Sequence, residues 1–177
     1  ARYRTEAGES ATSYFASMAG TGMSGAVARR LNTTTKALGG RMSSLIATVA
    51  VFRRWKNVEM TIDIDGERRR ALTEDVLVGN TEFHNGGMRL CPGARPDDGA
   101  FDVLVIGDVT KTDLVRTLPK LYRGTHLPHP KAELLRGATV TVDSDAPLPI
   151  ELDGEQPGTT PVRFEVVPRA LRVRVPA

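Results

Sequence analysis

The spacing of the hydrophobic residues changes near residue 57. Before this point, apolar residues recur every three or four positions at Met42, Leu45, Ile46, Val49, Phe52 and Trp55. This is the spacing of one face of an α-helix, so we predict a helix whose apolar stripe faces the core. Gly39-Gly40 marks its start. Arg53, Arg54 and Lys56 suit the negative end of the helix dipole.

From residue 58 onward the period is two, which is typical of strands. Met60, Ile62 and Ile64 alternate with polar residues, Asp65-Gly66 supplies a turn, and residues 72–80 run back as the second strand of a β-hairpin. Further strands are predicted at residues 14–19, 101–106, 138–142, 162–167 and 171–175. Many short strands predict a mainly β fold with α, an antiparallel β-sandwich-like domain with two or three helices.

A second helical pattern covers residues 111–123. Thr110 and Asp113 resemble a capping box, and Pro119 predicts a break or a kink. Four apolar residues share one face and three basic residues lie off it: Leu114, Leu118, Leu121 and Tyr122, and Lys111, Lys120 and Arg123. A basic amphipathic helix can lie on an anionic membrane, but the pattern also fits an ordinary surface helix.

Composition limits the class of protein. With 177 residues, 40% of them hydrophobic and 25% charged, the chain is expected to form one domain at 14–177 after a flexible start at 1–13. A net charge of +3 does not suit a polybasic nucleic-acid binder. The lone cysteine, Cys91, excludes an internal disulfide framework and fits a reducing compartment. The longest apolar run, 45–52, is far shorter than the roughly 18 residues of a membrane span.

Several motifs have a structural interpretation beside a chemical one. The glycine-rich segment at 20–25 lacks the Lys-Ser/Thr of a phosphate-binding loop, so a tight turn is expected. His84, Cys91, His126 and His129 are too scattered for a structural zinc site. Pro96-Asp97-Asp98-Gly99 is good turn chemistry, yet a carboxylate and two turn carbonyls could also hold a hard cation.

Asp-Gly-Glu occurs twice, at 65–67 and at 153–155. The first triplet lies at the predicted hairpin tip and is expected to be a solvated turn. A carboxylate can act as a general base on a hydroxyl group, but residue pattern alone does not say which triplet, if either, is catalytic.

The order of several motifs resembles the C-terminal half of the diacylglycerol kinase catalytic family, which includes bacterial lipid kinases and the sphingosine and ceramide kinases. The motifs are Val78-Gly79-Asn80, Asn85-Gly86-Gly87-Met88, Pro92-Gly93-Ala94 followed by Asp97-Asp98-Gly99 and Phe101-Asp102-Val103, and Asp153-Gly154-Glu155. An earlier segment from Phe15 to Met23 is similar to the family's N-x-x-G-x-G-F-D-A, with Ser24 where Asp is common.

The resemblance implies a β-sandwich domain and an active site in a cleft between two domains. It implies a magnesium site on the carboxylate of Asp98 and the carbonyls of Arg95 and Ala100. It also implies that Asp153 and Glu155 form the catalytic pair, without showing which of the two carboxylates is the general base. ATP and Mg²⁺ would be needed. Residues 111–123 and Arg68–Arg70 become candidates for docking on an anionic membrane that carries the lipid substrate.

The family's Gly-Gly-Asp-Gly-Thr loop for the ATP phosphates does not occur in this chain. The chain also begins with Ala1 rather than Met. We therefore expect a C-terminal domain whose own N-terminal nucleotide-binding domain is missing, inactive alone and prone to form dimers. The expected enzyme is cytoplasmic and peripheral at the inner membrane face. The alternatives are an NAD-kinase-like small-molecule kinase domain and a non-enzymatic lipid-binding or interaction module.

Overall fold

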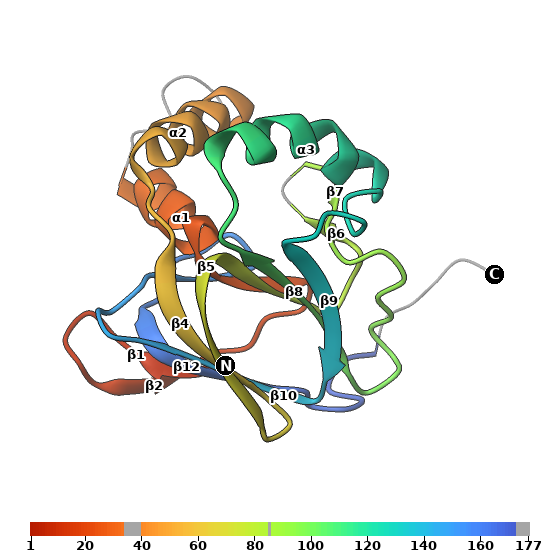
Figure 1. Ribbon diagram of the computed structural model, residues 1–177. Helices are drawn as coiled ribbons and strands as arrows, with labels where there is room; N and C mark the ends of the chain where they lie inside the picture. Colours follow the sequence, from red (N-terminus) through yellow and green to blue (C-terminus); the bar gives the residue numbers. More distant parts are fainter. Residues whose placement is uncertain (34–39, 85, 173–177) are drawn as a thin grey trace.

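The computed structural model describes residues 1–33, 40–84 and 86–172, and they form one sheet-rich body with helices at one end (Figure 1). The strands are β1 (Arg2–Arg4), β2 (Ser10–Thr12), β3 (Met18–Gly22), β4 (Val58–Ile64), β5 (Glu67–Gly79), β6 (Phe83–His84), β7 (Met88–Arg89), β8 (Phe101–Gly107), β9 (Ala132–Gly137), β10 (Thr139–Ser144), β11 (Ile150–Leu152) and β12 (Thr159–Glu165). The helices are α1 (Met23–Thr33), α2 (Gly40–Arg54) and α3 (Lys111–Arg123).

Strand β5 joins two halves of an antiparallel sheet. Its first half, up to Thr73, pairs with β4, and from there the order continues β10, β12, β1, β2. Its second half, from Asp75 to Gly79, lies between β3 and β8; β11 extends the sheet beyond β3, and β9 extends it beyond β8. The mainly β, antiparallel, sandwich-like fold with helices is therefore confirmed.

The main core contains side chains from both halves, among them Ile62, Val78, Val103, Ile150 and Phe164. A second cluster lies on the other face of the β3–β5–β8 half and contains Met18, Leu77, Leu90, Cys91 and Leu104. Leu121 of α3 packs against this second cluster. Because both faces are covered, the end of β5 reads as a continuous apolar run rather than an alternating one.

Several strands and helices that were predicted from turn residues, alternation or capping residues are confirmed. The β4–β5 hairpin turns at Asp65 (φ 50°) and Gly66 (φ 95°), a conformation that Asp-Gly favours. The strands predicted at 101–106, 138–142 and 162–167 correspond to β8, β10 and β12. Helix α3 has the predicted capping box, in which Thr110 and Asp113 bind each other's backbone N–H. A break at Pro119 does not occur, because the helix continues through this residue to Arg123.

Other expectations were wrong. The flexible start instead forms β1 and β2, with Tyr3 buried and β1 paired to β12. Residues 14–17 precede the strand, which begins only at Met18. Leu171 and Arg172 are not in a strand, and residues 173–175 lie outside the described residues.

The predicted tight turn at 20–25 is strand β3 running directly into α1. Gly22 has φ 128°, and a Cβ on Gly25 would lie 1.9 Å from the Pro149 carbonyl oxygen. The glycines therefore allow a sharp strand-to-helix junction packed against the approach to β11.

The predicted helix at 40–54 is confirmed as α2, but its apolar stripe is only partly buried. Val49 is exposed, Phe52 and the following Trp55 are half-buried, and the side chains of Met42, Leu45 and Ile46 lie outside the described part. None of the described helices combines the length and apolar character that crossing a membrane requires.

Candidate active site

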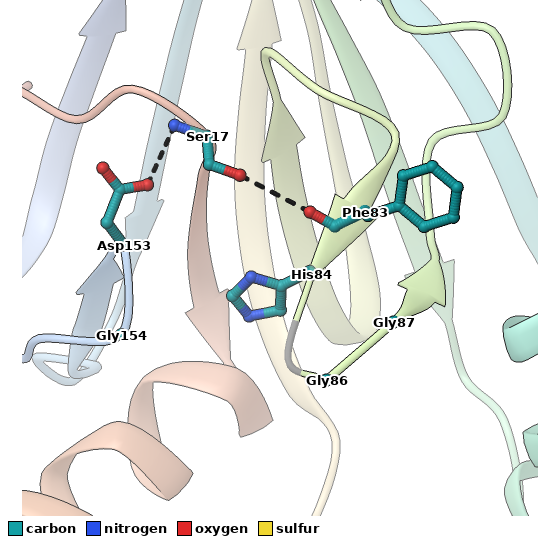
Figure 2. A pocket seen from close by; sticks show the side chains of 7 residues that line it. All are labelled: Ser17, Phe83, His84, Gly86, Gly87, Asp153 and Gly154. Atoms are coloured by element: carbon teal, nitrogen blue, oxygen red, sulfur yellow. Dashed lines mark hydrogen bonds between the residues drawn. The ribbon is translucent and has the colours of Figure 1, made fainter.

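Strand pairing brings three separate segments together at one end of the sheet. Leu152 at the end of β11 lies opposite Ala19, and Met18 lies opposite Gly79 at the end of β5. The turn at 153–155, the segment before β3 and the loop after β5 therefore meet. They border an open pocket of about 360 Å³ lined by Ser17, Phe83, His84, Gly86, Gly87, Asp153 and Gly154 (Figure 2).

Asp153 organises this end of the sheet. It has φ 47° in a two-residue turn between Leu152 and Glu155. Its Oδ1 accepts the backbone N–H groups of Ser17 (2.9 Å) and Met18 (3.0 Å), and its Oδ2 accepts that of Ala16 (2.7 Å). Three donors occupy the carboxylate, so Asp153 is suited to hold the segment 16–18 against the turn.

The same segment is held from its other side by Asn80. The Asn80 side-chain amide donates to the Ala16 carbonyl at 2.9 Å, and its backbone N–H donates to the Ser17 carbonyl at 2.8 Å. Ser17 Oγ and Thr81 Oγ1 are 2.8 Å apart. Two of the sequence motifs, Val78-Gly79-Asn80 and Asp153-Gly154-Glu155, therefore fix one wall of the pocket.

Glu155 differs from Asp153 in its surroundings. Its carboxylate is exposed and makes no hydrogen bond or ion pair with any residue that the structure describes. The tight turn fixes its backbone: Leu152 N–H donates to Glu155 O at 2.9 Å, and Glu155 N–H donates to Leu152 O at 3.0 Å. Of the predicted catalytic pair, Glu155 is thus the free carboxylate.

Sequence reasoning missed a buried pair beside this turn. His84 Nε2 lies 3.1 Å from Glu151 Oε1, within ion-pair distance but without the alignment of a hydrogen bond. Glu151 is 1% exposed, and its Oε1 also accepts the Gly154 N–H at 2.9 Å. Figure 2 shows the His84 ring between the 153–154 turn and the glycines at 86 and 87. The sequence held one sign of this buried pair: Glu151 is an acidic residue placed between two apolar residues, Ile150 and Leu152.

Two further buried acids lie on β5. Asp75 Oδ2 accepts the backbone N–H of Ser24, and its Oδ1 accepts the Ser24 hydroxyl, both at 2.9 Å. Asp75 therefore caps the start of α1 through Ser24. Burial raises the pKa of Asp75 to about 7, although the Ser24 hydrogen bonds oppose the shift. Burial, together with the charge of Asp75, raises the pKa of Glu74 well above its usual range.

The first Asp-Gly-Glu triplet is not merely a solvated turn. Asp65 accepts the backbone N–H groups of Ala138 (3.0 Å) and Thr139 (2.8 Å), so it joins the hairpin tip to β10. The topology puts this tip away from the pocket, at the far end of β5.

The predicted magnesium turn lies at the same sheet end as the pocket, because Asp102 on β8 pairs with Gly79. Asp98 Oδ1 accepts the Ala100 N–H at 3.2 Å, while its Oδ2 binds the guanidinium group of Arg136. Arg95 pairs with Asp97. The donor set of Asp98 and two turn carbonyls suits Mg²⁺, but an ion would compete with Arg136 for the carboxylate. Among the described residues, no three His, Cys, Asp or Glu side chains gather as a metal site.

Comparison with known proteins agrees with the motifs. Residues 17–175 match the family described as YegS C-terminal NAD kinase beta sandwich-like domain. A diacylglycerol kinase of Staphylococcus carnosus (strain TM300) is 25% identical over 173 residues, which cover 98% of this chain and 56% of the relative. A diacylglycerol kinase of Mycobacterium tuberculosis (strain ATCC 25618 / H37Rv) is 28% identical over 170 residues, covering 92% of this chain and 52% of the relative.

A solved structure from Bacillus anthracis str. Sterne, described as a candidate diacylglycerol kinase, has the same fold. Its TM-score is 0.64 at 19% identity, covering 94% of this chain and 53% of that one. The chain thus spans about half the length of these relatives. Since the family match covers most of the chain, the chain belongs to the YegS C-terminal NAD kinase beta sandwich-like family, the C-terminal domain of the diacylglycerol kinase family that its motifs indicated.

Proposed function

We propose that this chain is the acceptor-side domain of an ATP-dependent lipid kinase of the diacylglycerol kinase type. In this proposal the rest of the polypeptide supplies a nucleotide-binding domain, and the γ-phosphoryl group of ATP is transferred to a lipid hydroxyl group. The observation that carries it is the free carboxylate of Glu155, which follows the two turn residues, Asp153 and Gly154, that line the open pocket. The relatives named diacylglycerol kinase support the substrate class.

The pocket suits the acceptor rather than the phosphates. Of the seven described residues that line it, none is lysine or arginine. Phosphoryl transfer depends on positioning and on neutralising the charge of the phosphate oxygens, so those cations must come from outside this pocket. A Cβ on Gly86 or Gly87 would meet no atom within 4 Å, so this wall is open to a substrate.

The proposed reaction is a simple displacement. The lipid hydroxyl oxygen forms a bond to the γ-phosphorus, the bond from that phosphorus to the β–γ bridging oxygen breaks, and ADP leaves. Glu155 takes the hydroxyl proton, while Asp153 holds the segment 16–18 against the turn. Mg²⁺ on the nucleotide would neutralise phosphate charge, and a second ion on Asp98, with the carbonyls of Arg95 and Ala100, would order the turn at 95–100.

The test uses the full-length protein with ATP, Mg²⁺ and vesicles containing diacylglycerol, ceramide or a sphingoid base, with NAD as a soluble acceptor. Glu155→Gln should lower kcat roughly 10²–10⁴-fold and leave KM for ATP nearly unchanged, because a general base acts in the transition state. Glu67→Gln is the matched control, since Glu67 is the exposed glutamate of the other Asp-Gly-Glu triplet, at 65–67. Phosphorylation of NAD alone, or equal loss in both variants, would contradict the proposal.

A further inference from the structure

Helix α3 exposes apolar side chains that the packing of the domain does not use. Val115 is 61% exposed, Leu118 49% and Tyr122 51%. With the exposed Pro119, they occupy positions i, i+3, i+4 and i+7, so they form one continuous stripe along the helix. The sequence pattern had placed Leu118 and Tyr122 on one face with Leu114 and Leu121; the structure separates these pairs.

The inner face of α3 is fixed by packing. Leu114, Thr117 and Leu121 line a cavity of about 30 Å³ together with His126 and Ala132. The capping box at Thr110 fixes the start of the helix. The outer stripe therefore cannot be buried by rotating the helix without losing these contacts.

A basic stripe runs beside the apolar one. Arg116, Lys120 and Arg123 are exposed at positions i, i+4 and i+7, and none forms an ion pair within the part of the chain that the structure describes. The only acidic residue of α3, Asp113, is held in the cap by Thr110. The outer surface of α3 is thus apolar and cationic, with no acidic group to oppose an anionic partner.

The other candidate, Arg68–Arg70, is largely neutralised. Arg69 pairs with Glu133, and Arg70 pairs with both Glu59 and Asp145. These ion pairs satisfy two of the three guanidinium groups on neighbouring strands. No large apolar side chain of this hairpin tip is exposed; the exposed Leu72 lies further along β5.

The position of α3 places this surface beside the pocket. Helix α3 packs against β7, and β7 pairs with β6, which carries Phe83 and His84 (Figure 1). Phe83 lines the pocket and is 54% exposed. Exposed apolar side chains therefore occur on α3 and, through Phe83, on the β6–β7 hairpin, which lies between α3 and the pocket.

The geometry points to α3 as a docking helix that lies flat on an anionic lipid bilayer, with Val115, Leu118 and Tyr122 entering the interface and Arg116, Lys120 and Arg123 binding lipid phosphates. Tyr has the amphipathic ring that suits this boundary, and an interfacial helix needs both an apolar face and cations. This inference goes beyond the proposed reaction, because adsorption to a bilayer needs neither ATP nor turnover.

The test is sedimentation of the 177-residue chain with sucrose-loaded vesicles, without ATP. We expect binding to vesicles of 70% phosphatidylcholine and 30% phosphatidylglycerol, weak binding to pure phosphatidylcholine, and loss of binding as salt rises. Because each cation near such a surface contributes roughly a fivefold change in partitioning, Arg116→Gln/Lys120→Gln/Arg123→Gln should bind on the order of 100-fold less tightly. Val115→Gln/Leu118→Gln/Tyr122→Gln should lose at least roughly tenfold.

The charge-matched control is Arg68→Gln/Arg69→Gln/Arg70→Gln, which should bind like the wild type. The exposure-matched apolar control is Val167→Gln/Leu171→Gln. Thermal melts establish that all variants are folded. Failure of the chain to bind anionic vesicles, unchanged binding by the α3 variants, or an equal loss in the arginine control would overturn the inference. So would binding by the chain but not by the full-length protein, since another part would then cover α3.

Discussion

Asp65 and Asp153 share one backbone conformation, with φ 50° and 47°, and each is followed by a glycine with φ 95° or 92°. Each carboxylate also accepts backbone N–H groups from a different segment, two for Asp65 and three for Asp153. Asp-Gly-Glu is therefore first a structural unit in this protein: a tight turn whose aspartate joins it to a neighbouring strand. Its chemistry at 153–155 depends on what surrounds the glutamate.

The first prediction follows from this shared role. Asparagine tolerates positive φ, but its amide group cannot accept every N–H group that the carboxylate accepts. Asp65→Asn and Asp153→Asn should each lower the free energy of unfolding by about 1–3 kcal/mol, measured by urea denaturation. Only Asp153→Asn should also lower kinase activity of the full-length protein, because only its turn borders the pocket. If Asp65→Asn lost activity while Asp153→Asn kept normal kinetics, the turn at 153–155 would not be part of the active site.

The second prediction concerns Glu151 as a positioning residue. Glu151→Ala leaves His84 and the Gly154 N–H without their buried partner, so the turn that carries Glu155 should loosen. We expect a loss of about 1–3 kcal/mol in stability and a fall in kcat. Glu151→Gln retains an oxygen for Gly154 and should recover most of the kcat. Equal kcat in the Ala and Gln variants would show that the contact to Gly154 does not position the base.

The third prediction concerns the turn at 95–100. If Asp98 binds Mg²⁺, the ion stabilises the folded state in proportion to its occupancy, so the melting temperature should rise across a magnesium titration. Asp98→Ala should abolish this rise, whereas Asp97→Ala should keep it, because Asp97 is exposed and, among the described residues, pairs only with Arg95. Arg136→Gln should shift the titration to lower magnesium concentration, since it removes the competing cation. A wild-type protein insensitive to Mg²⁺ would contradict the magnesium site.

Sequence reasoning found the elements whose signals are local. The β4–β5 hairpin is encoded by alternation and one Asp-Gly turn, and the start of α3 by Thr110 and Asp113. It missed α1, which follows directly on the glycines of β3, because the cap that starts this helix is Asp75 from a strand about fifty residues away. It also missed β1, whose three residues are stabilised by pairing with β12 at the other end of the chain.

The candidate site also has one part that a local motif identified and another part that only the folded structure reveals. The motif at 153–155 identified Asp153 and Glu155, but not which of them is free, because that depends on the backbone N–H groups of the segment 16–18. Glu151 and His84 meet only through the β11–β3–β5 pairing. A side-chain contact between strands so distant in sequence has no signature in the spacing of the residues.

The last prediction concerns the pH dependence of stability. Asp75 has a folded-state pKa of about 7, raised chiefly by burial, against about 4 for an unfolded aspartate. Between pH 4 and pH 7 the folded protein therefore holds this proton while the unfolded chain has lost it, so this contribution to stability is complete below pH 4 and is lost as the pH rises through 7. Asp75→Asn stays neutral and can still bind both polar groups of Ser24, so it should lose less stability than the wild type between pH 5 and pH 8.

Glu74→Gln should change the pH dependence of stability in the same direction, because the pKa of Glu74 is also raised. Urea denaturation at several pH values gives the difference between wild type and variant, in which the other titrating groups cancel. A difference that does not change with pH would show that Asp75 is ionised throughout this range in the folded protein.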